Sequence, residues 1–110
     1  MTVHRETKAT GIPIEVKKAV FQRDHERCVW CGSPRGVPTA HIIRRSQGGR
    51  GIEQNIVTLC PECHREMDEG KNGARIMEYV RWLMTIYYPG WKPEDVIYHK
   101  YKEENDAQQD

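Results

Sequence analysis

The sequence predicts a small α+β fold, in which a metal-stapled core of a β-hairpin and a helix is flanked by further helices. Three observations predict it. The four cysteines form two CxxC pairs, at residues 28–31 and 60–63. Two short apolar stretches with a glycine-rich turn between them indicate two strands between the pairs. A longer stretch after the second pair repeats its apolar residues with helical spacing.

The first helix and the hairpin are placed by local signals. Pro13 suits the first turn of a helix, and a loose apolar face predicts this helix over residues 13–23. Strands are predicted over residues 37–43 and 56–59, because both are rich in β-branched residues. The glycines of residues 48–51 predict an exposed loop between them.

Two further helices follow the hairpin. Pro61 is placed to open a helix of about two turns that ends near Gly70. Apolar residues at i, i+3, i+4, i+7, i+8 and i+11 predict an amphipathic helix over residues 76–87, which the Pro-Gly pair at 89–90 ends. The aromatic segment 91–101 is expected to pack back on the domain.

The length of 110 residues predicts one domain. We expect residues 1–11 to be a flexible arm, residues 12–102 to form the domain around a core motif at 28–70, and residues 103–110 to be an acidic tail. Hydrophobic residues make up only 37% of the chain. A core this small often needs a bound metal or a disulfide for stability, and the cysteines could provide one.

The cysteines predict a reduced, metal-binding site. No stretch approaches the ~18 apolar residues that span a membrane, and the N-terminus lacks the apolar run of a signal peptide. We therefore expect a cytoplasmic protein without membrane partners, in which cysteines bind metal rather than form disulfides. Unpaired core cysteines are the alternative, but two complete CxxC pairs disfavour it.

Four thiolates from Cys28, Cys31, Cys60 and Cys63 would make a closed, structural zinc site. The 28 residues between the pairs exceed the ~15–20 of a simple zinc ribbon, and leave room for a hairpin with a site of its own. His64 could replace Cys63 as a ligand. We rank this lower, because adjacent residues rarely reach one ion.

Charge is distributed unevenly, although the net charge is only +1. Between the cysteine pairs, one acidic residue accompanies four basic ones, Arg35, Arg44, Arg45 and Arg50. After Lys102 the charged residues are all acidic. The alternative to a phosphate-facing surface is a solvated loop, and the concentration of arginines around one histidine favours the phosphate-facing surface.

The two CxxC pairs enclose an ordered set of polar residues. His41 lies between the pairs, Asn55 follows 14 residues later, and His64 comes directly after the last cysteine. This order resembles the HNH, or ββα-metal (His-Me finger), family of DNA endonucleases, over roughly Val20 to Gly70. The resemblance implies DNA as substrate and a small phage or prophage type of protein that acts with phage packaging proteins. No oligomeric state is implied.

The resemblance assigns His41, Asn55 and His64 as the catalytic residues. His41 would deprotonate the attacking water, a task that suits an imidazole with a pKa near neutrality. Asn55 would tie down the hairpin loop and so orient His41. His64 would bind a catalytic divalent ion. Without the motif, an exposed strand histidine and a turn asparagine would be the simpler interpretations.

Asp68 lies at i+4 from His64, on the same helix face, and some family members place a second ligand there. A His-carboxylate pair suits Mg²⁺, Mn²⁺, Ni²⁺ or Zn²⁺; a solvated helix-end residue is the alternative. Most members also carry a metal ligand just before the general base, where this chain has Ala40. We expect Asp68 to replace it.

The leading hypothesis is a metal-dependent HNH endonuclease that hydrolyses DNA phosphodiester bonds, nicking with weak sequence specificity. Its predicted phosphate-binding residues are Arg44, Arg45, Arg50 and Arg65. A non-catalytic, zinc-stabilised nucleic-acid-binding module is the alternative, and Ala40 is its best support. A purely structural zinc domain is a third hypothesis, supported by the aromatic residues Trp30, Trp82 and Trp91.

Overall fold

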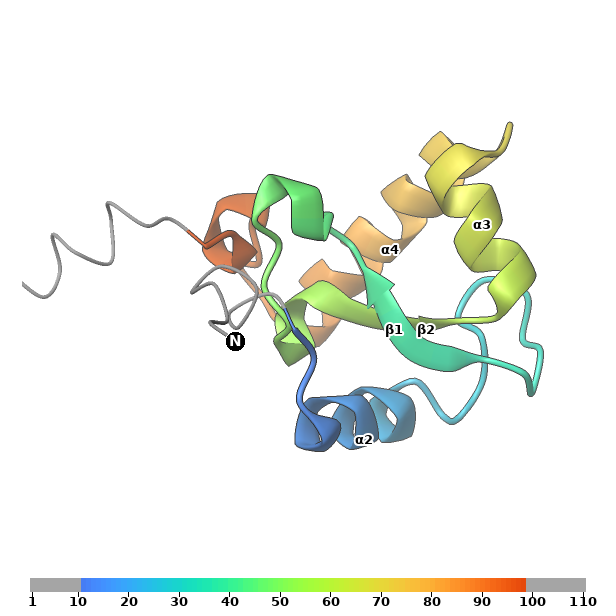
Figure 1. Cartoon of the computed structure of the whole chain (residues 1–110), viewed down its shortest axis with the longest axis horizontal. Helices are drawn as coiled ribbons and strands as arrows, with labels where there is room; N and C mark the ends of the chain where they lie inside the picture. The colour runs from blue at the N-terminus through green and yellow to red at the C-terminus, as the bar shows by residue number, and fades with distance from the viewer. Residues whose placement is uncertain (1–10, 99–110) are drawn as a thin grey trace, which may run out of the picture.

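The computed structural model describes residues 11–98, and its elements form the predicted α+β fold. An antiparallel hairpin lies between one helix that precedes it and two that follow it (Figure 1). The elements in chain order are α2 (Ile14–Arg23), β1 (Val37–His41), β2 (Ile56–Leu59), α3 (Pro61–Glu69) and α4 (Gly73–Tyr87). The predicted arm, except Gly11, and the predicted acidic tail lie outside the described residues.

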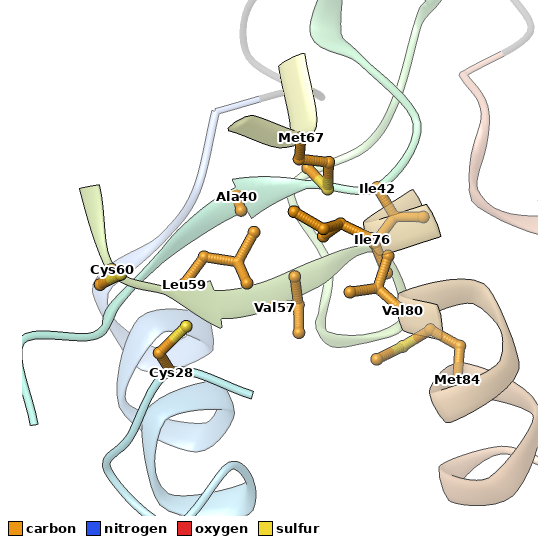
Figure 2. Packing of buried hydrophobic residues seen from close by; sticks show 10 residues of the cluster. All are labelled: Cys28, Ala40, Ile42, Val57, Leu59, Cys60, Met67, Ile76, Val80 and Met84. Carbon is orange, nitrogen blue, oxygen red and sulfur yellow. The ribbon is translucent and has the colours of Figure 1, made fainter. Parts of the chain in front are cut away.

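Strand β2 is the centre of the core. All four of its residues are buried, as expected for a short apolar run covered on both faces. Helix α2 contacts both strands, and residues of α3 and α4 join the main hydrophobic cluster with the hairpin (Figure 2). The buried members of this cluster are Cys28, Ala40, Ile42, Val57, Leu59, Cys60, Met67, Ile76, Val80 and Met84.

The helix boundaries follow the predicted signals. Pro13 directly precedes α2, and Pro61 occupies the first turn of α3. Helix α4 buries Ile76, Val80 and Met84 along one face, which confirms the helical periodicity. It ends before Pro89 and Gly90, and Gly90 has a φ of 88° that favours glycine.

Strand β1 ends at His41, two residues earlier than the sequence predicts. The backbone N–H of Ile42 still donates across the hairpin to the carbonyl of Asn55, at 2.8 Å. The next N–H, of Ile43, donates instead to the side-chain Oδ1 of Asn55, also at 2.8 Å. The chain therefore leaves the ladder because a side chain replaces the partner strand.

The prediction of an exposed loop at residues 48–51 was wrong. Gly49 and Gly51 are buried, and Gly49 forms an antiparallel bridge with Ile97. A Cβ atom on Gly49 would lie 1.7 Å from the carbonyl oxygen of Ile43, so glycine is required here for close backbone approach. The described part of the C-terminal segment, residues 91–98, thus packs back on the domain, with its partner in this glycine-rich loop.

Among the described residues, no helix is both long and apolar enough to cross a membrane.

Candidate active site

The four cysteines form one compact cluster. Their Sγ atoms lie within 4.8 Å of one another, and those of Cys31 and Cys60 are 3.7 Å apart. A tetrahedral zinc ion with Zn–S bonds of about 2.3 Å would separate its sulfurs by about 3.8 Å. The donor set and spacing therefore fit the predicted structural zinc site.

Two backbone turns present these thiols. After α2, the N–H of Cys28 donates to the carbonyl of Ser33, and that of Gly32 donates to the carbonyl of Cys28, both at 2.9 Å. This closes the first knuckle. In the second, Cys60 is the N-cap of α3 and Cys63 lies in its first turn. A helix N-terminus carries partial positive charge, which stabilises thiolates.

The pKa values of the thiols indicate how a bound cation would affect the cluster. Burial raises the pKa of Cys28, but backbone N–H groups of Cys31, Cys60 and Trp30 outweigh it and lower that pKa to about 7. Burial raises the pKa of Cys60 and Cys63, and the charge of Cys28 raises both further. Four thiolates repel one another, so a bound cation is needed for all four to ionise together.

A second feature is a cleft of ≈ 460 Å³ between the hairpin and α3. Strand β1 contributes His41 to it, and α3 contributes His64 and Asp68. Arg44 and Arg45 reach it from the segment after β1. The structure thus brings together five of the residues that the sequence singled out. The complete lining is Thr39, His41, Arg44, Arg45, Ser46, His64, Asp68 and Glu69.

His64 and Asp68 face each other along α3. The Nε2 atom of His64 lies 3.5 Å from Oδ2 of Asp68, and the side chains are 35% and 45% exposed. An imidazole nitrogen and a carboxylate oxygen this close can share one divalent ion while water completes its coordination. These two residues could therefore bind the predicted divalent ion as two of its ligands, with the remaining positions open to solvent.

Asn55 is completely buried and holds the segment that follows His41. Its Nδ2 donates to the carbonyls of Ile43, at 3.1 Å, and Arg50, at 2.8 Å. Its Oδ1 accepts from the N–H of Ile43. The amide thereby closes residues 43–50 into a loop, which is the contact that the resemblance implied for this asparagine.

Ala40 lies on the opposite side of β1 from the cleft. It is 0% exposed and belongs to the hydrophobic cluster (Figure 2), whereas Thr39 and His41 on either side of it line the cleft. Successive side chains on a strand point to opposite faces. Ala40 therefore packs into the core, while its neighbours on β1 face the cleft.

The four predicted phosphate-binding arginines are not equivalent. Arg44 and Arg45 line the cleft, and Arg44 Nη2 donates to the backbone carbonyl of Asp68 at 3.0 Å. Arg50 and Arg65 do not line it. Arg65 is exposed on α3, while Arg50 has a buried Nε atom with no hydrogen-bond partner. Arg44 therefore also joins the loop to the end of α3.

Sequence reasoning missed three residues that line the cleft, Thr39, Ser46 and Glu69. Strand alternation could have found Thr39, two residues before His41. It also missed the ion pair of Arg23 with the fully buried Asp24, whose Oδ2 accepts the N–H of Thr58 at 2.9 Å. Arg23 and Asp24 are adjacent in sequence, but the backbone groups of Ile56 and Thr58 that they bind lie on a distant segment, so the sequence does not show this cluster.

The cleft lies between the strand that carries His41 and the helix that follows the second cysteine pair. Residues 28–69 match the family model described as HNH endonuclease, and the chain belongs to this family.

Two curated proteins are similar to parts of the chain. One is the type IV methyl-directed restriction enzyme EcoKMcrA of Escherichia coli (strain K12), with 45% identity over 38 residues. This match covers 34% of the chain and 14% of the enzyme's length. The other is anaredoxin of Nostoc sp. (strain PCC 7120), with 31% identity over 58 residues, covering 52% of the chain and 76% of that protein.

Proposed function

We propose that the protein is a metal-dependent endonuclease that hydrolyses DNA phosphodiester bonds, one strand at a time and with weak sequence specificity. One observation carries the proposal. A single cleft holds a strand histidine, the His64–Asp68 pair and two arginines. Phosphodiester hydrolysis needs those three elements: a proton acceptor for water, a cation site at the phosphate, and positive charge along the backbone.

His41 is the proposed general base. Its imidazole on β1 faces the cleft, and imidazole is the side chain that most often acts as a general base toward water. His64 and Asp68 would hold a divalent ion. When bound, such an ion polarises the phosphate and stabilises the leaving 3′ oxygen. The base and the ligands of the ion would thus come from two different elements, β1 and α3.

Arg44 and Arg45 are the proposed phosphate contacts within the cleft, and Arg50 and Arg65 remain candidates outside it. Arg44 already uses one donor on Asp68, but a guanidinium carries five N–H groups. Contacts to phosphates hold the DNA without reading its sequence. We therefore expect weak sequence preference. Partnership with phage packaging proteins is a proposal that rests on the resemblance alone.

The second candidate function is the non-catalytic, zinc-stabilised nucleic-acid-binding module. Its best support is the missing ligand at Ala40, but this residue faces the hydrophobic core, and the cleft-facing neighbours are Thr39 and His41. An alanine there is explained by packing. Ion-dependent nicking by the wild type is therefore the observation that distinguishes the two candidates.

The test is plasmid nicking. Purified protein is incubated with supercoiled DNA and Mg²⁺, Mn²⁺, Ni²⁺ or EDTA, and wild type is compared with His41→Ala. We expect ion-dependent nicking that falls by roughly 10²–10⁴ in His41→Ala, with DNA binding and zinc content retained. His25→Ala is a matched control, because His25 is an exposed histidine in the turn after α2. Retardation of DNA without nicking under any ion would favour the binding module.

A further inference from the structure

Arg23, at the end of α2, uses every N–H of its guanidinium. Its Nε donates to Asp24 Oδ1 at 2.9 Å, and one Nη2 hydrogen donates to Asp24 Oδ2 at 3.2 Å. The other Nη2 hydrogen bonds the carbonyl of Ile56 at 2.7 Å. Nη1 donates to the carbonyl of Glu53 at 2.8 Å and to the Tyr88 hydroxyl at 3.2 Å.

The surroundings of this guanidinium keep it in one place. Its side chain is only 13% exposed, and that of Asp24 is 0% exposed. Its Cζ atom lies 4.8 Å from the centre of the Tyr87 ring and 5.9 Å from that of Tyr88. Cation–π contact and five saturated donors leave Arg23 with one geometry. Helices α2 and α4 therefore meet at this residue.

The two backbone carbonyls that Arg23 holds, those of Glu53 and Ile56, lie on either side of Asn55 in the sequence. Asn55 in turn bonds both the N–H and the carbonyl of Ile43, two residues after His41. Hydrogen bonds at both ends, joined by the backbone of the turn at residues 53–56, thus connect Arg23 to the segment that follows β1.

We infer that Arg23 is a positioning residue for the cleft, acting through Asn55 on the backbone beside His41. The effect of Arg23 on catalysis rests on the proposed function. Its effect on the position of the loop after β1 does not depend on that function. The fixed guanidinium of Arg23 holds the turn in place, and the turn fixes the orientation of the Asn55 side-chain amide. That amide in turn determines the residue at which β1 ends. Lysine could not replace Arg23, because an ammonium has three donors and no planar fork.

The experiment compares Arg23→Lys and Tyr88→Phe with wild type and a control. Tyr88→Phe keeps the ring and removes one acceptor, so it provides a mild variant if Arg23→Lys does not fold. Val20→Ala is the control, because Val20 is a fully buried residue of α2 that makes no side-chain hydrogen bond to the turn. It lowers stability without breaking these hydrogen bonds.

The structural measurement is the native-state hydrogen-exchange rate of the Ile43 amide, expressed as a ratio to the exchange rate of the Val29 amide. Val29 is the reference because its amide donates to the Thr58 carbonyl, at 3.0 Å, and does not contact Asn55. We expect Arg23→Lys to raise this ratio about tenfold or more and Tyr88→Phe to raise it less, because both loosen the Asn55 turn. Val20→Ala should leave the ratio unchanged. An unchanged ratio in folded Arg23→Lys and in Tyr88→Phe, or an equal rise in Val20→Ala, overturns the inference.

The catalytic measurement is plasmid nicking at saturating ion. We expect Arg23→Lys to lower kcat by about 10–100-fold with little change in KM, since misplacing a catalytic group costs rate more than binding. An unchanged kcat in a variant whose Ile43 exchange has risen would show that this connection does not reach the chemistry. If wild type does not nick DNA, the proposed function fails, and the exchange ratio still decides whether Arg23 positions the loop.

Discussion

Oδ2 of Asp68 lies 3.5 Å from Nε2 of His64, one turn earlier on α3, and both side chains line the cleft that His41 enters from β1. Their spacing is a property of the helix, because side chains four residues apart lie on one face. Their relation to His41 depends on how α3 packs against the hairpin. The pair is the strongest candidate for holding a divalent ion in this cleft.

If Asp68 is a ligand, Asp68→Ala should weaken Mn²⁺ binding as His64→Ala does, by about tenfold or more, and excess ion should partly restore nicking in both. Glu69→Ala is the control, since Glu69 lines the same cleft without facing His64 in an ion pair. Calorimetric titration of zinc-loaded protein measures the affinities. Wild-type affinity in Asp68→Ala would reduce Asp68 to a helix-end charge.

The cysteine cluster should bind one structural zinc. Cys28→Ser or Cys60→Ser should release about one equivalent and unfold the domain, because binding energy on the order of 10 kcal/mol is folding energy in such sites. Ser33→Ala, in the same knuckle, should keep its zinc. Acidification should release zinc, since the ligands must be deprotonated. Metal analysis with circular dichroism checks this, and a folded wild type without zinc would refute it.

Arg44→Ala combined with Arg45→Ala should weaken DNA binding equally for all sequences. The slope of log K against log salt should become shallower by about 0.9 for each phosphate that the variant no longer neutralises. Arg75→Ala with Arg81→Ala removes the same charge from exposed positions on α4, away from the cleft. Binding is measured over a salt series. A slope that changes equally in both double variants would argue against a specific role for the cleft arginines.

Residues 39 and 40 offer a test of the two faces of β1. Ala40→Asp should destabilise the protein by on the order of 3 kcal/mol, because it puts a carboxyl group into the apolar core. Thr39→Asp, on the cleft face, should fold normally and tighten the binding of hard ions such as Mn²⁺. Thermal unfolding and ion titration distinguish them. A stable Ala40→Asp variant with tighter ion binding would show that residue 40 reaches the cleft after all.

Local chemistry determined much of this structure. Pro61 and the Pro-Gly pair at 89–90 marked where helices begin and end, and the spacing of Ile76, Val80 and Met84 predicted the buried face of α4. The two CxxC pairs predicted the cluster that the structure assembles. These features depend on bonds within a few residues, or on a metal-ligand pattern that has few alternatives, so sequence alone determines them.

Tertiary structure decided what depends on contact between distant segments. The buried Gly49 needs Ile97 as a partner, and the early end of β1 needs the side chain of Asn55. The inward position of Ala40 and the clamp of Arg23 on the turn at residues 53–56 likewise exist only once helices and hairpin have packed. Sequence patterns indicate which residues prefer burial or a turn, whereas the partner of each buried polar group is chosen by the packing of the whole chain.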